Sequence, residues 1–389
     1  MNILLSIHHR LNKNEGAPGV TYQLYQEYKE LGHEVSIFSI DDIPSFIPNK
    51  LKSFLFPVFF YFHVKKTSRK KKIHVIDASS GDSWILSLLR NNKRNLDTVL
   101  VARSHGLEHT VHQSRLDQQR VGDIKLSWKY PIYHGGLRLW EVSTSFKKAD
   151  GCLFLNKHDL QYALKNIKAN ERYSRIISNG LPNYFLNLSG AIKPVPSHEK
   201  MQIAQVGSYI PRKGILYTAK AMNVILEQFP SIELSFIGTG CSVEKVLMDY
   251  KPEFHNRIHV ISKYNHEDLP KLLIGKHILM FPSLAEGFPL VLIEAMACGL
   301  LPIATSTPGP LTILKDGYDS VIVPPADSKA IENSLHNIVT DPERLNQIRI
   351  NAYKSAQRYK WSVIAKETIE FYEEIRLGKS NLNERTRLF

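Results

Sequence analysis

The feature that most constrains this chain is a regular alternation of short β-branched runs with longer stretches that carry apolar residues at helical spacing. The short runs lie at 33–38, 73–77, 98–102, 151–155, 202–206, 232–238, 257–261, 277–281 and 301–305. Strands that are apolar along their whole length and alternate with helices predict parallel sheets covered on both faces. With 389 residues the chain has room for two domains. We therefore expect an α/β fold with two doubly wound domains.

One segment breaks this rhythm and suggests where the domains meet. Residues 186–200 contain Pro, Ser and Gly without any periodic pattern, which is typical of an interdomain linker. We predict an N-terminal domain at 1–185 and a C-terminal domain at 201–357. Apolar residues return at helical spacing near the end, so 358–389 is expected to form a terminal helix that crosses back to the N-terminal domain.

Composition excludes several classes of protein. The three cysteines lie far apart without C-x-x-C spacing, which argues against a disulfide framework or a structural zinc site. The first apolar stretch is too short for a secretory signal, and no apolar run reaches the roughly 18–20 residues of a membrane-spanning helix. We expect a cytoplasmic protein with reduced thiols.

Charge is distributed unevenly along the chain. Residues 1–185 hold 27 Lys and Arg against 16 Asp and Glu, a net charge of +11, whereas the remaining residues hold 23 against 21, a net charge of +2. Only the N-terminal half is therefore expected to meet an anionic surface.

Within that half, an aromatic run is followed directly by a basic run. Residues 54–62 are FLFPVFFYF, and six of the eight residues at 65–72 are cations. This pairing predicts a peripheral contact with an anionic membrane, on the inner face of the plasma membrane. A buried helix followed by a solvated loop is an alternative, and Pro57 is expected to interrupt any long helix. Nucleic acid is not an expected partner, because no binding module is present. The membrane-facing candidates are Phe59, Phe60, Lys65, Lys66, Arg69, Lys70, Lys71 and Lys72.

The most specific stretch is 281–299, FPSLAEGFPLVLIEAMACG. It predicts a buried strand, a turn through Glu286, and a helix from about 289 to 298 that Gly299 terminates. The free N–H groups of such a helix start form an anion site. Glu286 and Glu294 are eight residues apart, so their carboxylates can accept hydrogen bonds from different hydroxyls of one elongated ligand. The alternative is a pair of ordinary surface glutamates.

Glu286 and Glu294 resemble the E-x7-E signature of the retaining glycosyltransferases of the GT-B fold, family 4, also called glycosyl transferases group 1. Further segments are similar to this family in the expected order: SHG at 104–106, SNGLP at 178–182, VGSYIPRKG at 206–214, FIGTG at 236–240, LKDGYDSVIVPPAD at 314–327 and YKWSVIA at 359–365. The resemblance implies two Rossmann-like domains that face a cleft. The N-terminal domain would bind the acceptor and the C-terminal domain the nucleotide-sugar donor.

The resemblance also implies roles for individual residues. Glu286 would bind hydroxyls of the transferred sugar, Glu294 the ribose, and Lys213 the diphosphate. His105 would help to position the donor sugar, so the catalytic candidates are His105, Lys213 and Glu286. The donor-binding candidates are Gly207, Ser208, Arg212, Lys213, Gly238, Gly287, Phe288, Pro289, Leu290, Val291 and Glu294, and the acceptor-loop candidates are Gly16, Gly19, Glu108 and Asn179.

The chain departs from the family pattern at one cation. Ser208 stands where the family usually carries an arginine, and we hypothesise that Arg212 supplies this charge from the same loop. No D-x-D triplet is present, so a helix dipole and cations are expected to replace a metal. His8 and His9 are adjacent on a predicted strand and should point to opposite faces, which makes them poor joint metal ligands. We expect no metal and no cofactor.

These observations predict a retaining transferase that moves a hexose-type sugar from a nucleotide diphosphate sugar to a glycan or lipid-linked acceptor. The basic, aromatic N-terminal half favours cell-surface polysaccharide or glycolipid biosynthesis. One alternative is a non-transferring enzyme on the same fold, such as a nucleotide-sugar epimerase or a phosphorylase. Another is a catalytically silent scaffold that binds a sugar nucleotide.

Overall fold

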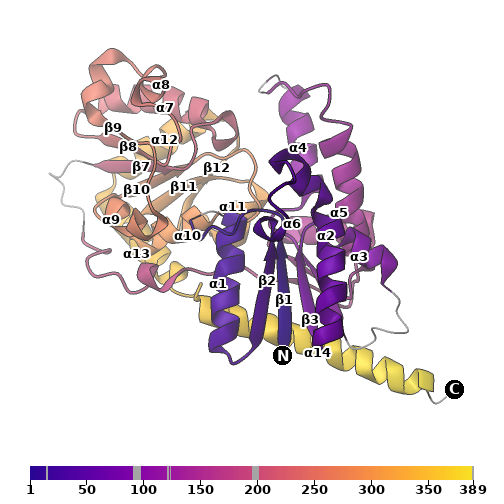
Figure 1. Cartoon of the computed structure of the whole chain (residues 1–389). Coiled ribbons are helices and arrows are strands. Elements are labelled where there is room, and N and C mark those ends of the chain that lie inside the picture. Colours follow the sequence, from indigo (N-terminus) through magenta and orange to yellow (C-terminus); the bar gives the residue numbers. More distant parts are fainter. Residues whose placement is uncertain (15, 91–97, 121, 123, 195–200, 388–389) are drawn as a thin grey trace. The chain divides into compact units, whose positions relative to one another are not determined.

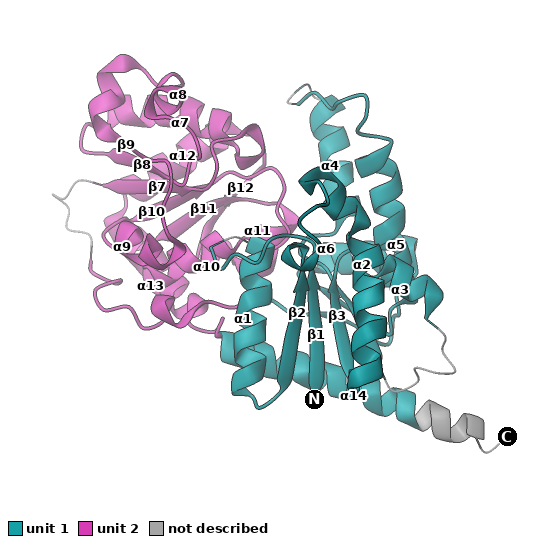
Figure 2. Cartoon of the chain, in the orientation of Figure 1, with its two compact units in different colours: residues 1–179, 361–389 teal, residues 180–360 magenta. Residues whose placement is uncertain are grey.

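The computed structural model is shown in Figure 1 and describes residues 1–14, 16–90, 98–120, 122, 124–194 and 201–387. The chain divides into two units, which Figure 2 colours separately. Unit 1 comprises Met1–Asn179 and Trp361–Phe389, and unit 2 comprises Gly180–Lys360. The first part of the expected linker thus belongs to unit 2, and its residues 195–200 lie outside the described residues.

Unit 1 is built on a six-stranded parallel sheet in the order β2-β1-β3-β4-β5-β6. Its strands are β1 Asn2–Ile7, β2 Glu34–Ser39, β3 Val75–Ser79, β4 Val99–Arg103, β5 Gly151–Phe154 and β6 Ser174–Ile176. Its α-helices are α1 Gly16–Glu30, α2 Asn49–Lys70, α3 Trp84–Leu89, α4 Glu108–Arg120, α5 Arg138–Lys148, α6 Lys157–Tyr162 and α14 Trp361–Arg387. Short 3₁₀ or π turns lie at Ile40–Asp42, Tyr133–Leu137 and Ala163–Ile167.

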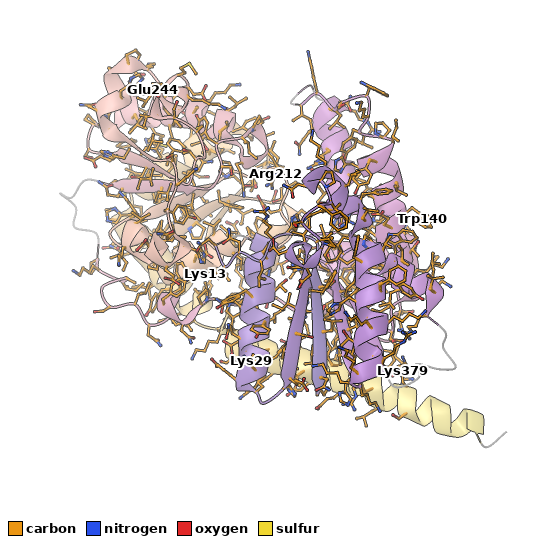
Figure 3. The ribbon with its side chains drawn as sticks, viewed as in Figure 1. Lys13, Lys29, Trp140, Arg212, Glu244 and Lys379 are labelled. Carbon is orange, nitrogen blue, oxygen red and sulfur yellow. The ribbon has the colours of Figure 1, made fainter. Side chains whose placement is uncertain are left out.

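Helices cover both faces of this sheet, as its buried strands require. Helix α2 packs on one face next to α3, which in turn contacts α5, and helices α1 and α14 pack together on the other face (Figure 1). Near the end of α14, Lys379 Nζ, labelled in Figure 3, donates to Asp150 Oδ2 at 2.8 Å and to the carbonyl of Thr98 at 3.0 Å. The last helix is therefore fastened to the sheet of unit 1.

Unit 2 repeats the design with a parallel sheet in the order β12-β11-β10-β7-β8-β9. Its strands are β7 Gln202–Val206, β8 Glu233–Ile237, β9 Ile258–Ile261, β10 Ile278–Phe281, β11 Leu301–Thr305 and β12 Val321–Val323. Its α-helices are α7 Ile215–Gln228, α8 Val243–Leu247, α9 Leu269–Leu273, α10 Leu290–Ala297, α11 Pro308–Ile313, α12 Ser328–Val339 and α13 Pro342–Ala356. Short 3₁₀ turns lie at Asn183–Phe185, Pro211–Lys213, Pro252–Arg257 and His266–Asp268. Two parallel sheets covered by helices confirm the predicted α/β class.

Helix α2 differs from its prediction. It runs unbroken for 22 residues with Pro57 inside it, so the expectation that Pro57 would interrupt the helix was wrong. An internal proline costs about 3 kcal/mol or more because it removes one hydrogen bond and crowds the preceding turn. Phe56 and Phe60 on the same helix are fully buried in a core cluster with Phe38. Burial of two phenylalanine side chains, each contributing about 1.5–3 kcal/mol, offsets that cost.

Candidate functional site

Three neighbouring strands of unit 2 carry most of the predicted donor-binding residues in the loops that follow them. Strands β7, β8 and β10 lie side by side, and Gly207, Gly238 and Glu286 lie in the loops after them. The order of the strands reverses between β7 and β10. Ligands of open α/β sheets bind at such a reversal, outside the carboxyl ends of the strands. The topology therefore brings these loops to the edge where a ligand is expected.

The central contact at this edge is one carboxylate held by two cations. Lys213 Nζ donates to Glu286 Oε1 at 2.7 Å, and Arg212 Nη1 donates to the same oxygen at 2.9 Å. Arg212, labelled in Figure 3, also donates to the carbonyl of Ala285 at 2.8 Å. Lys213 and Glu286 are mostly buried, which strengthens their attraction relative to a pair in water. Three of the predicted charged residues thus meet at one point.

A glycine fixes how the two loops of this cluster approach each other. Gly214 has a φ of +69°, and a Cβ at this position would lie 2.1 Å from the carbonyl oxygen of Pro282. Only glycine fits such a contact. The Leu284 amide also donates to the carbonyl of Arg212 at 2.9 Å. The loop after β7 and the loop after β10 are therefore one structural piece, which directs Arg212 and Lys213 toward Glu286.

Helix α10 begins directly after the β10 loop, within one residue of its predicted start. Pro289 is its N-cap, and Leu290 and Val291 form its first turn. Within the described chain no side chain caps this end of the helix. Its first N–H groups, together with the positive end of the helix dipole, therefore suit a phosphate or a sugar oxygen. Gly287 and the buried Phe288 connect Glu286 to this helix.

The remaining predicted loop residues have different environments. Ser208 is exposed and carries no charge, so Arg212 and Lys213 are the cations that the β7 loop brings to Glu286. Gly207 and Gly238 both have positive φ values, +123° and +80°. A Cβ at Gly238 would lie 2.6 Å from the Tyr264 ring. Glycine is therefore required at 238 for close packing as well as for backbone conformation.

The second carboxylate of the motif, Glu294, has a partner that the sequence did not indicate. Its Oε1 lies 2.7 Å from His266 Nε2, and His266 Nδ1 lies 2.6 Å from the Tyr184 hydroxyl. Burial alone would lower the pKa of His266, but the hydrogen bond to Glu294 and the charge of Glu294 raise it above its ordinary value. Because His266 is 28 residues from Glu294 and belongs to no motif, no local signal pointed to it. His266 and Tyr184 hold the Glu294 carboxylate in place.

Unit 1 contains a cavity of about 360 Å³ at the carboxyl edge of its own sheet. The ends of β1 and β3, the loop after β4, helix α4 and the segment 130–138 contribute its lining residues. The order of the strands reverses between β1 and β3, so this cavity also occupies a position where α/β sheets bind ligands. The predicted residues His105 and Glu108 both line it.

His105 lines this cavity and has one ring nitrogen without a partner among the described residues. Its Nε2 is buried and has no hydrogen-bond partner among the described residues. Burial, followed by the positive charge of Arg103, lowers the pKa of His105 to about 3. The ring is therefore neutral at neutral pH, and its free nitrogen can hydrogen-bond a ligand hydroxyl.

Glu108 belongs to a network of charged side chains. It is the only one of them that the sequence analysis predicted as a site residue. Arg138 donates to Glu108 Oε1 at 3.2 Å and to Glu141 Oε2 at 3.3 Å, and its Nη2 lies 3.4 Å from His8 Nε2. His8 Nδ1 in turn lies 2.7 Å from Asp82 Oδ1. This network holds the Glu108 carboxylate at the cavity wall.

The two adjacent histidines are close together instead of pointing to opposite faces. The rings of His8 and His9 have centroids 4.4 Å apart, and both residues line the cavity. The prediction was wrong because β1 ends at Ile7, so the alternation of a strand does not extend to them. Within the described ranges, no group of three or more His, Cys, Asp and Glu is placed to hold a metal ion.

The predicted acceptor-loop glycines lie inside a helix. Gly16 and Gly19 belong to the first turns of α1, whereas the sequence analysis assigned them to a loop. A Cβ at Gly19 would lie 3.0 Å from the carbonyl oxygen of Lys13, so this helix and the preceding loop approach closely. Ala17, between the glycines, lines the cavity. Asn179 is buried at the end of the first segment of unit 1.

The aromatic and basic segment of helix α2 divides between core and surface. Phe60 is fully buried, so we correct its assignment from the membrane-facing set to the core, while Phe59 is partly buried. Phe62 is 59% exposed. All six cations are exposed: Lys65, Lys66, Arg69, Lys70, Lys71 and Lys72.

Two further expectations concern the chain as a whole. All three cysteines are free thiols, and Cys152 and Cys298 are buried. None of the helices in the described parts of the chain combines the length and apolar character that crossing a bilayer requires.

Comparison with known proteins gives a family match for the C-terminal part of the chain. Residues 192–355 match the family model described as glycosyl transferases group 1. The sucrose-phosphate synthase from Thermosynechococcus elongatus superposes with a TM-score of 0.77 at 20% identity, over 97% of this chain and 99% of that one. This likeness shows the fold.

Two curated relatives extend the match in sequence. The UDP-Gal:alpha-D-GlcNAc-diphosphoundecaprenol alpha-1,3-galactosyltransferase of Escherichia coli is 23% identical over 291 residues, which are 72% of this chain and 70% of the relative. The phosphatidyl-myo-inositol mannosyltransferase of Mycolicibacterium smegmatis is 25% identical over 42% of each chain. Apart from the Escherichia coli enzyme, the chain spans about half or less of the curated relatives it matches.

Proposed function

We propose that this chain, whose residues 192–355 match the glycosyl transferases group 1, is a glycosyltransferase that transfers a hexose-type sugar, with retention, from a nucleotide diphosphate sugar to a glycan or lipid-linked acceptor. The meeting of Arg212, Lys213 and Glu286 at one edge of unit 2 is the observation that carries this proposal. In the cell, the reaction would belong to cell-surface polysaccharide or glycolipid biosynthesis.

The donor would bind along this edge in three parts. Glu286 accepts hydrogen bonds from sugar hydroxyls, Glu294 accepts them from the ribose, and the first turn of α10 meets the phosphates. When the glycosidic bond breaks, negative charge develops on the leaving diphosphate. Lys213 and Arg212 stabilise that charge, which is the interaction that gains most in the transition state.

The acceptor hydroxyl attacks from the face on which the diphosphate leaves. A phosphate oxygen of the leaving group accepts the proton of that hydroxyl, so no protein nucleophile is assigned. Since two cations and a helix N-terminus already neutralise the diphosphate, we propose that neither a metal ion nor a cofactor takes part.

The test of the donor site is a panel of UDP, GDP and ADP and their sugar conjugates, measured by thermal shift with added divalent metal and with a chelator. We expect one nucleotide family to stabilise the chain equally in both conditions, and Lys213→Ala to lose most of that shift. Glu286→Ala should abolish transfer while leaving the fold intact. Full transfer by the Glu286 variant, or a strict need for metal, contradicts the proposal.

We further propose that the chain works peripherally at the cytoplasmic face of the plasma membrane on a lipid-linked acceptor. The exposed cations in the last turns of helix α2 and just after it, together with the exposed Phe62, support this location. The Escherichia coli relative, named for a diphosphoundecaprenol acceptor, supports the class of acceptor. Replacing the six cations with glutamine should abolish sedimentation with anionic vesicles in low salt. Unchanged sedimentation would show that this segment is an ordinary solvated surface.

A further inference from the structure

The cavity of unit 1 has one group of lining residues that the roles proposed so far leave unexplained. The rings of His112 and His134 lie nearly parallel to that of Tyr130, with centroids 5.6 and 5.8 Å from it and interplanar angles of 17° and 26°. His112 Nδ1 lies 3.1 Å from the Tyr130 hydroxyl. The Arg115 guanidinium lies 5.8 Å from the Tyr130 ring centroid. We call His112, Arg115, Tyr130 and His134 the basic wall; all four line the cavity.

The charges at this cavity are not balanced. Arg138, the other arginine of the lining, is paired with Glu108 and Glu141. Arg115 has no carboxylate partner among the described residues, although Arg120 on the same helix is paired with Asp117. Burial lowers the pKa of His134, and the positive charges of Arg115 and Arg138 act in the same direction. The basic wall therefore presents a positive field for which the described chain supplies no anion.

Three of these lining residues are arranged along one helix face. Glu108, His112 and Arg115 occupy positions i, i+4 and i+7 of helix α4, so they share a face. At 1.5 Å per residue, Glu108 and Arg115 are separated by about 10 Å along the helix axis. A hexose whose phosphate lies across the ring from its reacting hydroxyl has a comparable length.

The cavity thus offers two kinds of contact at two ends. At one end His105, whose buried Nε2 has no partner among the described residues, and the Glu108 carboxylate both line the cavity and suit hydroxyl groups. At the other end a guanidinium beside two imidazoles suits a phosphate, because arginine binds phosphate oxygens in a bidentate manner. A volume of about 360 Å³ is in the range of a small-ligand site.

We infer that the acceptor is a sugar that carries a phosphate or diphosphate ester, with this ester bound by the basic wall and its reacting hydroxyl placed at His105 and Glu108. This inference rests on the proposed glycosyl transfer and names the acceptor chemistry that the transfer would use. Tyr130 stacks with both histidines and so orders the basic wall, and Arg115 supplies the charge. A neutral sugar would leave Arg115 without a counter-charge.

The test is direct binding of small phosphate probes to the full chain by isothermal titration calorimetry. The probes are inorganic pyrophosphate and the 1-phosphates of glucose, galactose and N-acetylglucosamine, each compared with its unphosphorylated sugar. Saturating UDP occupies the donor cations, or Lys213→Ala removes one of them if UDP does not bind. We expect at least one phosphorylated probe to bind and its parent sugar not to bind.

Two matched variants on helix α4 locate the binding. Arg115→Gln should weaken binding of the phosphorylated probe at least about tenfold, because a hydrogen-bonded charge is lost. Arg120→Gln removes the same charge from an exposed position of the same helix and should leave binding within about twofold. Equal binding by the Arg115 variant and the wild type, or tighter binding of the parent sugar, overturns the inference.

A second arm distinguishes the source of the phosphate. The sugar 1-phosphate that binds best is compared, as an acceptor, with the same sugar attached through diphosphate to a short polyprenol in detergent micelles. Transfer to both, with each lost in Arg115→Gln, shows that the ester itself is recognised. Transfer to the lipid form alone, again lost in Arg115→Gln, identifies a lipid-linked acceptor. Transfer to the unphosphorylated sugar at the same rate sinks the inference.

Failure of this inference is distinguishable from failure of the proposed function. Hydrolysis of the donor by water in the absence of acceptor does not use the acceptor's phosphate ester. Intact hydrolysis in Arg115→Gln, with unchanged use of phosphorylated acceptors, removes the inference but keeps the transferase. Absence of any donor binding or hydrolysis in the wild type removes the proposed function, while the pyrophosphate titration still decides whether the basic wall binds phosphate.

Discussion

Replacing Asp77 by asparagine tests how the interior of unit 1 is held together. Asp77 Oδ2, on strand β3, accepts hydrogen bonds from Arg103 Nε at 2.9 Å and Nη2 at 2.7 Å, and from the Tyr372 hydroxyl of α14. The Tyr28 hydroxyl of α1 lies 3.2 Å from that of Tyr372, and all four side chains are buried. Burial alone would lower the pKa of Arg103, but Asp77 raises it well above its ordinary value. One charge pair thus connects two strands and two helices.

The magnitude follows from this burial. Asparagine keeps the shape of aspartate, but it leaves the Arg103 guanidinium without a counter-charge, and breaking a buried pair in this way costs about 3–5 kcal/mol. A domain has only about 5–15 kcal/mol of stability in total. We therefore expect unit 1 to become marginally stable. Tyr372→Phe removes one hydrogen bond to the same carboxylate and should cost about 1–3 kcal/mol.

Tryptophan fluorescence during urea unfolding provides the assay. All four tryptophans, at 84, 128, 140 and 361, belong to unit 1, so their emission follows this unit alone. Asp117→Asn is the matched control, because Asp117 pairs with Arg120 on an exposed face and should change stability by less than about 0.5 kcal/mol. A loss below about 1 kcal/mol for Asp77→Asn, with an unchanged slope against urea, would refute the reasoning.

Three further predictions concern the two candidate sites. His266→Ala removes the partner of Glu294 and should weaken UDP binding about tenfold in calorimetry. The melting of unit 1 should not change. An unchanged affinity for UDP would show that Glu294 does not need His266. Lys213→Met should lower the turnover number of transfer more than it raises KM, because the charge acts on the departing diphosphate. A change in KM alone, measured by steady-state kinetics, would contradict this prediction. The folded state keeps His105 neutral down to a pKa of about 3, whereas the unfolded chain takes up the proton near pH 6.5, so stability should fall as pH drops from 6.5 toward 3. This loss of stability is at most about 5 kcal/mol, because the ring borders the cavity. In urea titrations at pH 5 and pH 7, the stability of His105→Gln should drop less than that of the wild type.

Sequence reasoning worked best where local pattern and global fold agree. The strands at 202–206 and 301–305 begin and end where the apolar runs predicted, and α10 lies within one residue of its prediction. Buried parallel strands are continuous apolar runs, so their signal is strong. The short edge strands β6 and β12 were not predicted, because three residues at the side of a sheet carry too little pattern.

The parts of the sites that sequence reasoning did not find are contacts between residues far apart in the chain. His266 reaches Glu294 across 28 residues, and Tyr130 reaches His112 across 18. Nothing near any of them distinguishes a ligand-binding side chain from an ordinary surface one. Pro57 shows the opposite case, in which a strong local signal was overridden by burial of the neighbouring aromatic side chains. Whether such residues belong to a site depends on contacts between distant parts of the chain, and a single sequence does not show these contacts.

The return of α14 to unit 1 has a consequence for synthesis of the protein on the ribosome. Unit 2 is continuous, so all of its strands have been made once Lys360 has emerged. Synthesis of unit 1 began earlier, yet its buried Arg103 and Asp77 lack their contact with the hydroxyl of Tyr372 until α14 has been made. The nascent chain therefore completes its second unit before its first. A truncation in α14, or a stalled ribosome before it, would leave the first-made residues exposed to chaperones and proteases while the later-made unit is already folded.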